Sequence, residues 1–176
     1  MRGDTMSDHP VLLCFDGSEN AVAAIPAAAE LLGPRTAVVL TVFEPVAVWE
    51  PYDPGAVLSA GVATLGSESL GLNKIAMQVA EEKLEHGVAL AREAGFDARG
   101  QLANGKPWHA ICEAASNLDA VVIVLGARGL SRVKSMLLGS VSSAVSVHAG
   151  RPVLVIPHHE PDERSSDDSV GTESDD

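Results

Sequence analysis

The stretch AVVIVLGARGLSRVKSMLLGSVS, residues 120–142, joins an apolar run to a series of spaced glycines. Residues 120–125 are apolar and rich in β-branched side chains, which predicts a buried strand. Gly126 and Gly129 follow this strand, and Gly139 precedes a segment of helical character. Glycines let backbone N–H groups approach a ligand closely, and a helix N-terminus offers unpaired N–H groups and the positive end of a dipole. The stretch therefore predicts an anion site, and phosphate is the anion that fits it best.

The rest of the chain alternates short apolar runs with segments of helical character. This alternation is typical of a single α/β domain with a doubly wound parallel sheet and helices on both faces. In such a sheet ligands bind beyond the carboxyl ends of the strands, where the strand order reverses. Residues 126–129 follow one such end, Asp16 follows another and residues 42–44 lie at a third, so we expect them to lie together. The expected strands are 11–15, 36–43, 97–103, 120–125 and 153–156, and the expected helices are 19–32, 72–94, 107–117 and 140–148.

Two parts of this pattern are less regular, and a third is the clearest amphipathic helix of the chain. Pro26 lies inside the first helix and should kink it. Residues 44–71 contain several prolines and glycines, so a long loop is expected there, with room for one short helix. Residues 72–94 predict an amphipathic helix, and its apolar stripe is expected to consist of Ile75, Val79, Leu84, Val88 and Ala91.

The composition fits one domain with an aliphatic core, because 46% of the 176 residues are hydrophobic and only 3% are aromatic. The formal net charge of −12 is uneven: residues 160–176 contain eight acidic residues and one arginine, and residues 10–159 carry only −4. An acidic body argues against nucleic-acid binding, which needs a basic face. We expect a disordered N-terminal tail at residues 1–9, one domain at 10–158 and an acidic disordered tail at 159–176.

Other features bear on where the protein works. Cys14 and Cys112 have no disulfide or metal-ligand spacing, and both are expected to be buried, reduced thiols. Residues 1–9 are too polar for a signal peptide, and no apolar run approaches the ~20 residues of a membrane span. A cytoplasmic protein without membrane association is therefore expected. His158 and His159 are adjacent but have no further ligands, so no metal site is expected there.

The spacing Gly126-x2-Gly129-x9-Gly139-Ser140 resembles the nucleotide-binding signature of the universal stress protein family. The similarity extends to CFDGSENA near the start, NGKPWHAICEAA in the middle and RPVLVIP near the end. It implies five parallel strands in the order 3-2-1-4-5, an adenine nucleotide alpha hydrolase-like fold, with a nucleotide between the first and fourth strands. It also implies a homodimer in which strand 153–156 pairs antiparallel with its counterpart. An edge strand covered by its own loop is the alternative.

The resemblance further implies which residues contact the nucleotide. Asp16 corresponds to an aspartate that contacts it; the alternative is a cap of the following helix, and one residue can do both. Val42 corresponds to a backbone contact with adenine. Arg128 could neutralise phosphate charge, although a solvated loop arginine is an equal alternative. Cys14 stands where several members have proline or another small residue. The glycines are expected to contact phosphate and ribose, and the serine segment to contact phosphate through N–H and hydroxyl groups. The full set is Cys14, Asp16, Val42, Leu125, Gly126, Arg128, Gly129, Gly139, Ser140, Val141 and Ser142.

The sequence shows no arrangement typical of catalysis: no nucleophile elbow, no metal-ligand set and no paired carboxylates outside the acidic tail. Asp16 is the one acid expected in the site. We therefore expect a universal stress protein that binds ATP as a regulatory ligand, with Mg²⁺ bridging the phosphates and at most slow hydrolysis. AMP or cyclic AMP is the alternative ligand, because one helix N-terminus serves one phosphate or three. A nucleotide-independent partner or scaffold protein is the alternative of another class, with residues 44–71 and the acidic tail as its contact surfaces.

Overall fold

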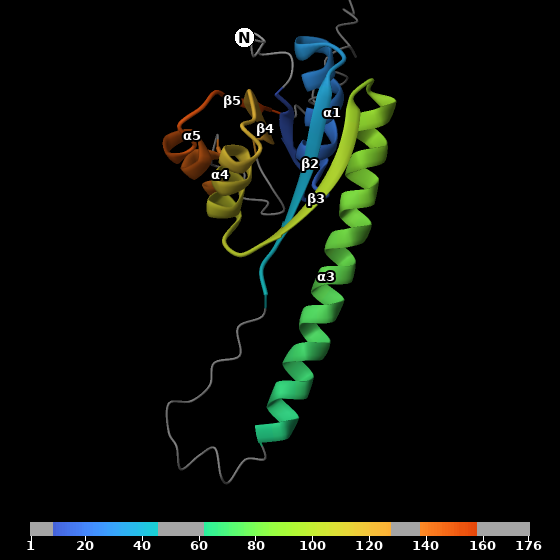
Figure 1. Cartoon of the computed structure of the whole chain (residues 1–176), viewed down its shortest axis with the longest axis vertical. Helices are drawn as coiled ribbons and strands as arrows, with labels where there is room; N and C mark the ends of the chain where they lie inside the picture. Colours follow the sequence, from blue (N-terminus) through green and yellow to red (C-terminus); the bar gives the residue numbers. More distant parts are fainter. Residues whose placement is uncertain (1–8, 46–61, 128–137, 158–176) are drawn as a thin grey trace, which may run out of the picture.

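One five-stranded sheet forms the centre of the molecule (Figure 1). The computed structural model describes residues 9–45, 62–127 and 138–157, and the side chains among them except for 62–70. The strand order is β3-β2-β1-β4-β5 and every neighbouring pair is parallel, so the predicted fold class and strand order are confirmed. The strands are β1 (Val11–Cys14), β2 (Thr36–Phe43), β3 (Asp97–Asn104), β4 (Val122–Gly126) and β5 (Val153–Ile156). The helices are α1 (Glu19–Leu32), α3 (Val62–Glu93), α4 (Pro107–Asn117) and α5 (Ser140–His148).

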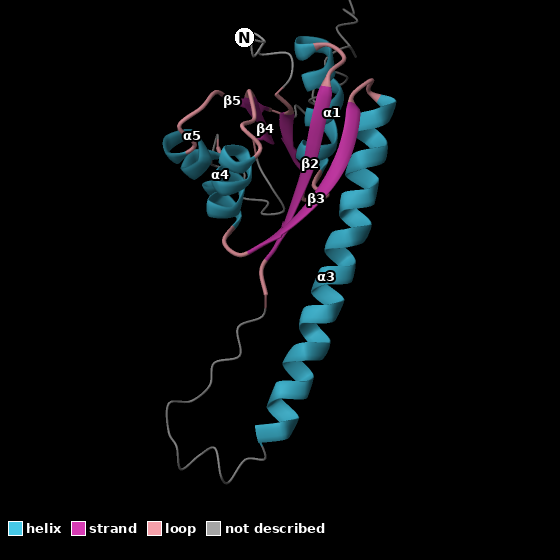
Figure 2. Ribbon diagram, viewed as in Figure 1, coloured by secondary structure: helices cyan, strands magenta, loops and turns pink. Residues whose placement is uncertain are grey.

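The helices cover the two faces of the sheet in pairs (Figure 2). On one face α1 and α3 pack over a cluster that includes Leu13 and Val39. On the other face α4 and α5 pack over a cluster that includes Leu12 and Val38. Successive residues along β1 and along β2 therefore face opposite sides of the sheet, and both sides are buried. This explains why these strands appear in the sequence as unbroken apolar runs.

Local sequence signals set most of the element ends correctly. α1 begins after Ser18, whose Oγ accepts a hydrogen bond from the N–H of Ala21 at 3.3 Å. α4 begins with Pro107. Proline is favoured at the first helical position, because the N–H that it lacks would have no partner within the helix. α1 is continuous across Pro26, whose ring is exposed, so the proline does not end the helix, and the expected kink stays a prediction.

The predicted loop at residues 44–71 is wrong in its second part, because α3 already begins at Val62. Gly66 and Gly71 favour a break in the sequence pattern, but a glycine inside a helix costs only about 1 kcal/mol relative to alanine, which a helix of 32 residues tolerates. Residues 46–61 of the predicted loop lie outside the described residues. No described helix combines the length and hydrophobicity needed to cross a membrane.

The predicted apolar stripe of α3 is also wrong in its first part. Ile75 is 61% exposed and Val79 is 44% exposed, whereas Ala80 is only 4% exposed. The five-residue step from Val79 to Leu84 turns a helix by about 140°, so these two residues cannot share one face. The buried face is Ala80, Leu84, Val88 and Ala91, and the N-terminal half of α3 extends beyond the sheet (Figure 1).

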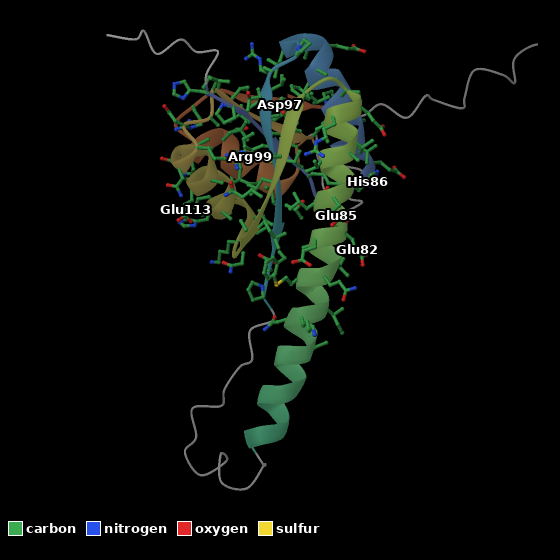
Figure 3. The ribbon with its side chains drawn as sticks, turned by 45° about the vertical axis from the view of Figure 1, so that its right-hand side comes forward. Glu82, Glu85, His86, Asp97, Arg99 and Glu113 are labelled. Atoms are coloured by element: carbon green, nitrogen blue, oxygen red, sulfur yellow. The ribbon has the colours of Figure 1, made fainter. Side chains whose placement is uncertain are left out.

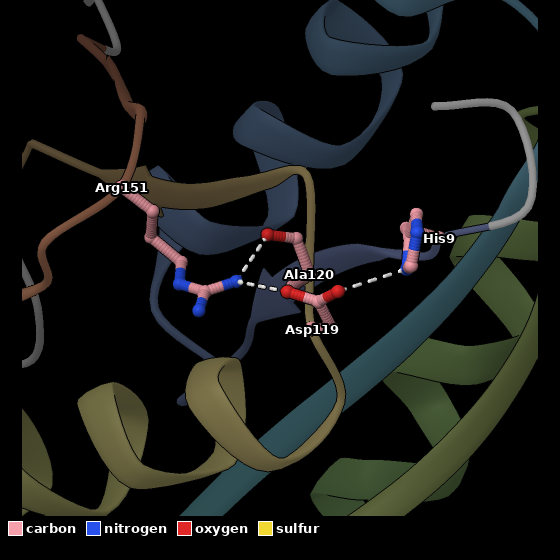
Figure 4. Close-up of polar contacts among 4 residues, drawn as sticks. All are labelled: His9, Asp119, Ala120 and Arg151. Atoms are coloured by element: carbon pink, nitrogen blue, oxygen red, sulfur yellow. Dashed lines mark hydrogen bonds and ion pairs between the residues drawn. The ribbon is translucent and has the colours of Figure 1, made fainter. Parts of the chain in front are cut away.

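A polar cluster joins strand starts at the amino edge of the sheet (Figure 4). The carboxylate of Asp119 lies 3.3 Å from Nδ1 of His9 and 3.7 Å from Nη1 of Arg151. Arg151 Nη1 also donates to the carbonyl oxygen of Ala120, which ties the approach to β5 to the approach to β4. Asp119 is exposed, so the ion pairs themselves contribute little stability. The cluster lies at the edge opposite to the one where parallel sheets bind ligands.

Candidate functional site

The connection from β1 to α1 brings Asp16 to the carboxyl edge of the sheet. Gly17, the next residue, has a φ of 80°, a left-handed conformation that favours glycine. Oδ1 of Asp16 accepts a hydrogen bond from the N–H of Ser18 at 2.9 Å, and Ser18 itself caps α1. Asp16 is therefore not the helix cap. Its second carboxylate oxygen makes no hydrogen bond within the described part of the chain, so it is available to a ligand.

β2 extends beyond the end of β1, which leaves part of its backbone without a strand partner. Alternate residues of a parallel strand direct both N–H and C=O toward the same neighbour. The carbonyl of Leu40 accepts from the N–H of Phe15 at 2.9 Å, so Leu40 faces β1, and Val42 faces the same way. The carbonyl of Phe15, which would continue the ladder to Val42, accepts instead from Oγ1 of Thr41 at 2.9 Å. Val42 therefore offers an N–H donor and a C=O acceptor past the end of β1.

Close packing joins the end of β4 to the starts of α1 and α5. A Cβ on Gly126 would lie 2.8 Å from the backbone carbonyl carbon of Asn20, so only glycine fits there. The hydroxyl of Ser142 donates to the carbonyl oxygen of Gly126 at 2.9 Å. This hydroxyl holds α5 against β4 and its proton is not free for a phosphate. Ser142 was expected to contact phosphate through both its N–H and its hydroxyl. Because the hydroxyl is bonded to Gly126, only the N–H remains for that contact.

The N-terminus of α5 has no side-chain cap. Its N-cap residue is Gly139, and the first helical bond runs from the N–H of Ser143 to the carbonyl of Gly139 at 2.9 Å. The N–H groups of Ser140, Val141 and Ser142 precede this bond, and no group in the described part of the chain accepts from them. Together with the helix dipole, these N–H groups form a donor set suited to an anion.

The ends of β1, β2 and β4 and the N-terminus of α5 surround one cavity of ≈ 320 Å³. This volume is at the lower end of the roughly 300–1,000 Å³ typical of small-molecule sites. Every predicted site residue that the structure describes lines this cavity. Arg128 and Gly129 lie outside the described residues, so their predicted contacts stay predictions. The predicted residues that line the cavity are Cys14, Asp16, Val42, Leu125, Gly126, Gly139, Ser140, Val141 and Ser142.

The cavity is also lined by residues outside the predicted site set. The most important is Glu44, a second acid beside Asp16, where one acid was expected. The sequence feature that could have placed Glu44 in the predicted site is its position two residues beyond Val42, just after the end of a strand. The remaining additions form apolar walls, and they are Phe15, Ala21, Leu40, Pro107 and Ile111. Within the described residues no group of three or more His, Cys, Asp or Glu side chains could hold a metal ion.

The two cysteines lie on the α4 side of the sheet. Cys14 and Cys112 pack against the same core cluster, and both are free and partly buried, so the expected burial is confirmed only in part. Desolvation raises the pKa of both thiols, and at Cys14 the neighbouring Cys112 and Asp16 add to this effect. Cys14 therefore presents a neutral thiol to the cavity at physiological pH.

Fold and site together define an α/β protein of the doubly wound class, with a cavity at the point where the strand order reverses between β1 and β4. The model of the universal stress protein family matches residues 9–157, so the chain belongs to this family. A universal stress protein of Thermus aquaticus (QAH/OAS sulfhydrylase 3′ region) is 34% identical over 151 residues, covering 83% of this chain and 96% of that protein.

Solved structures show the same fold. The chain superposes on the hypothetical protein MJ0577 of Methanocaldococcus jannaschii with a TM-score of 0.69, at 22% identity, covering 89% of this chain and 99% of that one. It superposes on the universal stress protein from Archaeoglobus fulgidus in complex with dAMP with a TM-score of 0.56, at 21% identity, covering 84% of this chain and 97% of that one.

Proposed function

We propose that this universal stress protein binds an adenine nucleotide in the ≈ 320 Å³ cavity as a regulatory ligand in the stress response, and that the nucleotide is ATP. The observation that carries the proposal is the uncapped N-terminus of α5 in the cavity wall. Three backbone N–H groups without partners in the described part of the chain are suited to a phosphate group. The dAMP complex of the Archaeoglobus relative supports the same class of ligand.

The chemistry of the cavity walls favours one orientation of the nucleotide. The phosphates belong at the α5 end, because Asp16 and Glu44 on the β1 and β2 side would repel them. These carboxylates are acceptors, so they suit ribose hydroxyls or an exocyclic amine. The backbone N–H and C=O of Val42 match the N1 acceptor and N6 donor of adenine. Guanine presents an acceptor at O6 in place of that donor, so the same edge disfavours it.

The number of phosphates is the finer part of the proposal. AMP or cyclic AMP is the alternative to ATP, since one helix N-terminus is sufficient for one phosphate. With ATP we expect Mg²⁺ to be held by the phosphates, and hydrolysis to be at most slow.

We predict that the purified protein releases an adenine nucleotide on denaturation, identified by chromatography and mass. Titration calorimetry of nucleotide-free protein should give tighter binding for ATP than for AMP, cyclic AMP or adenosine, and at least tenfold weaker binding for GTP. Tightest binding of AMP or cyclic AMP would keep the site and change the ligand. Protein that is isolated empty and gives no heat with any adenine nucleotide would contradict the proposal.

We further propose a homodimer formed through β5, the last strand of the sheet. The carbonyls of Pro152 and Ile156 accept from Ile123 and Ala127 on the β4 side, so the alternate residues Val153 and Val155 face the edge that no other described strand pairs with. An unpaired edge is a template for another strand.

Val155→Pro removes an edge N–H and leaves the bonds to β4 in place. We predict that sedimentation velocity will show a dimer for the wild-type protein and a monomer for Val155→Pro, with an unchanged far-ultraviolet spectrum. Val155→Thr, which keeps the N–H, is the matched control. A dimer that persists in Val155→Pro would show that the interface lies elsewhere.

A further inference from the structure

Glu44 lies in the cavity wall directly after the backbone groups that we expect to bind the base. The carbonyl of Phe43 accepts from the N–H of Gly105 at 3.0 Å, so the backbone groups of Phe43 face β3. The backbone groups of its neighbours Val42 and Glu44 therefore face the opposite side, where the pairing of β2 with β1 has already ended at Leu40. Val42 and Glu44 both line the cavity, and they follow one another along its β2 wall.

The side chain of Glu44 belongs to the face of the sheet that α4 covers. Side chains along a strand alternate between the two faces, and Leu40 and Val42 pack against the cluster under α4 and α5. Glu44 is the next residue in this alternation, and Pro107 and Ile111 of α4 line the cavity together with it. Its carboxylate accepts no hydrogen bond from the described residues, so both oxygens are available to a ligand.

The direction of β2 determines which atoms of an adenine would lie near Glu44. The N–H of a residue precedes its C=O along the chain, so an adenine bound to Val42 has N1 toward Leu40 and N6 toward Glu44. The amine at N6 carries two hydrogens, and only one of them can point at the carbonyl of Val42. The second hydrogen points further along the chain, to the side on which Glu44 lines the cavity. A carboxylate is only an acceptor, so it complements this hydrogen.

We propose that Glu44 accepts the second N6 hydrogen of the bound adenine, and that this contact makes the site specific for purines with an amine at C6. The inference rests on the proposed function for the class of ligand and for the orientation of the base at Val42. It adds a side-chain acceptor to the two backbone groups. Guanine presents a carbonyl oxygen at the same position, and a carboxylate repels it.

The test compares ATP with purine riboside triphosphate, which has hydrogen in place of the amine at C6. The phosphates are identical, so their repulsion by a carboxylate cancels in the ratio of the two affinities within one variant. Glu44→Met removes the acceptor with a side chain of similar length. Glu44→Gln is the matched variant, because it removes the charge and keeps an acceptor oxygen.

Glu113→Met is the control for net charge. Glu113 is an exposed acid of α4 that does not line the cavity. Figure 3 shows it on the side of α4 that faces away from the sheet. The substitution therefore removes the same charge as Glu44→Met, from a neighbouring element, without changing the cavity wall.

We expect the ratio of ATP affinity to purine riboside triphosphate affinity, measured by titration calorimetry, to fall about 2- to 12-fold in Glu44→Met. The loss of one hydrogen bond has an effect of this size. The ratio should stay higher in Glu44→Gln than in Glu44→Met, since the amide oxygen still accepts. In Glu113→Met the ratio should equal that of the wild type.

The outcomes separate this inference from the proposed function. An unchanged ratio in Glu44→Met, with ATP still bound, would overturn the inference and leave the proposed function in place. Tighter ATP binding by Glu44→Met at an unchanged ratio would also overturn it, because Glu44 would then only repel the phosphates. An equal fall in Glu113→Met would reduce the effect to net charge and contradict the inference. A wild-type protein that binds neither nucleotide would contradict the proposed function, and the inference would fail with it.

Discussion

Ser140→Pro should lower the affinity for ATP roughly 10- to 150-fold while the protein stays folded. The substitution removes one N–H that has no partner in the described part of the chain and that belongs to the donor set in the cavity wall. A hydrogen bond to a charged group contributes about 1.5–3 kcal/mol, and about 1.4 kcal/mol corresponds to a factor of ten. Proline is favoured at the first helical position. Gly139, with φ −70° and ψ 161°, already has the extended conformation that a residue before proline adopts.

The matched control for this prediction is Ser140→Ala, which removes the hydroxyl and keeps the N–H. The ratio of the two affinities, measured by calorimetry, isolates the backbone donor. Adenosine should bind both variants equally, and the thermal midpoint of Ser140→Pro should match that of Ser140→Ala. Equal ATP affinity for the two variants would show that the N–H of residue 140 does not contact phosphate, and would remove the main support for the proposed orientation.

Most of the sheet and its helices could be predicted because their signals are local. The runs 36–43 and 153–156 are strands with the predicted bounds, and the helix 140–148 has its predicted bounds as well. Buried parallel strands need continuous apolar runs, and helix ends need particular residues such as Ser18 and Pro107. The strand order is not local information, and its prediction rested on the resemblance to the universal stress protein family.

The features that could not be predicted depend on contacts between elements that are far apart in the sequence. One error on α3 was avoidable, because Ile75 lies nine residues before Leu84, about 180° round the helix, so periodicity alone places it off the buried face. The spacing of the glycines indicated the anion site, but the commitment of the Ser142 hydroxyl to Gly126 depends on the distance between two elements. Glu44 follows a strand in the sequence, and only the longer course of β2 relative to β1 places it in the cavity wall.

Gly126→Ala should destabilise the protein by about 1–3 kcal/mol, the usual penalty for inserting a carbon into a close-packed region. The new Cβ would lie 2.8 Å from the carbonyl carbon of Asn20 and 2.9 Å from its carbonyl oxygen, and these backbone atoms cannot rotate away. The φ of Gly126 is not positive, so alanine is not strained there by its own backbone. For a chain of this size the loss corresponds to a fall in thermal midpoint of roughly 2–12 °C. The same glycine thus serves packing between β4 and α1 as well as the cavity.

Gly71→Ala is the matched control, because Gly71 lies in α3 without a positive φ, and a Cβ added there would have no heavy atom within 4 Å. It should stabilise the protein by up to about 1 kcal/mol through helix propensity, so two identical chemical changes should have opposite signs. Asn20→Gly in the Gly126→Ala background removes only one of the close contacts and should not restore stability, since the backbone atoms of residue 20 remain. Restoration by Asn20→Gly would show that the contact is with a side chain, and that β4 and α1 do not require glycine at their crossing.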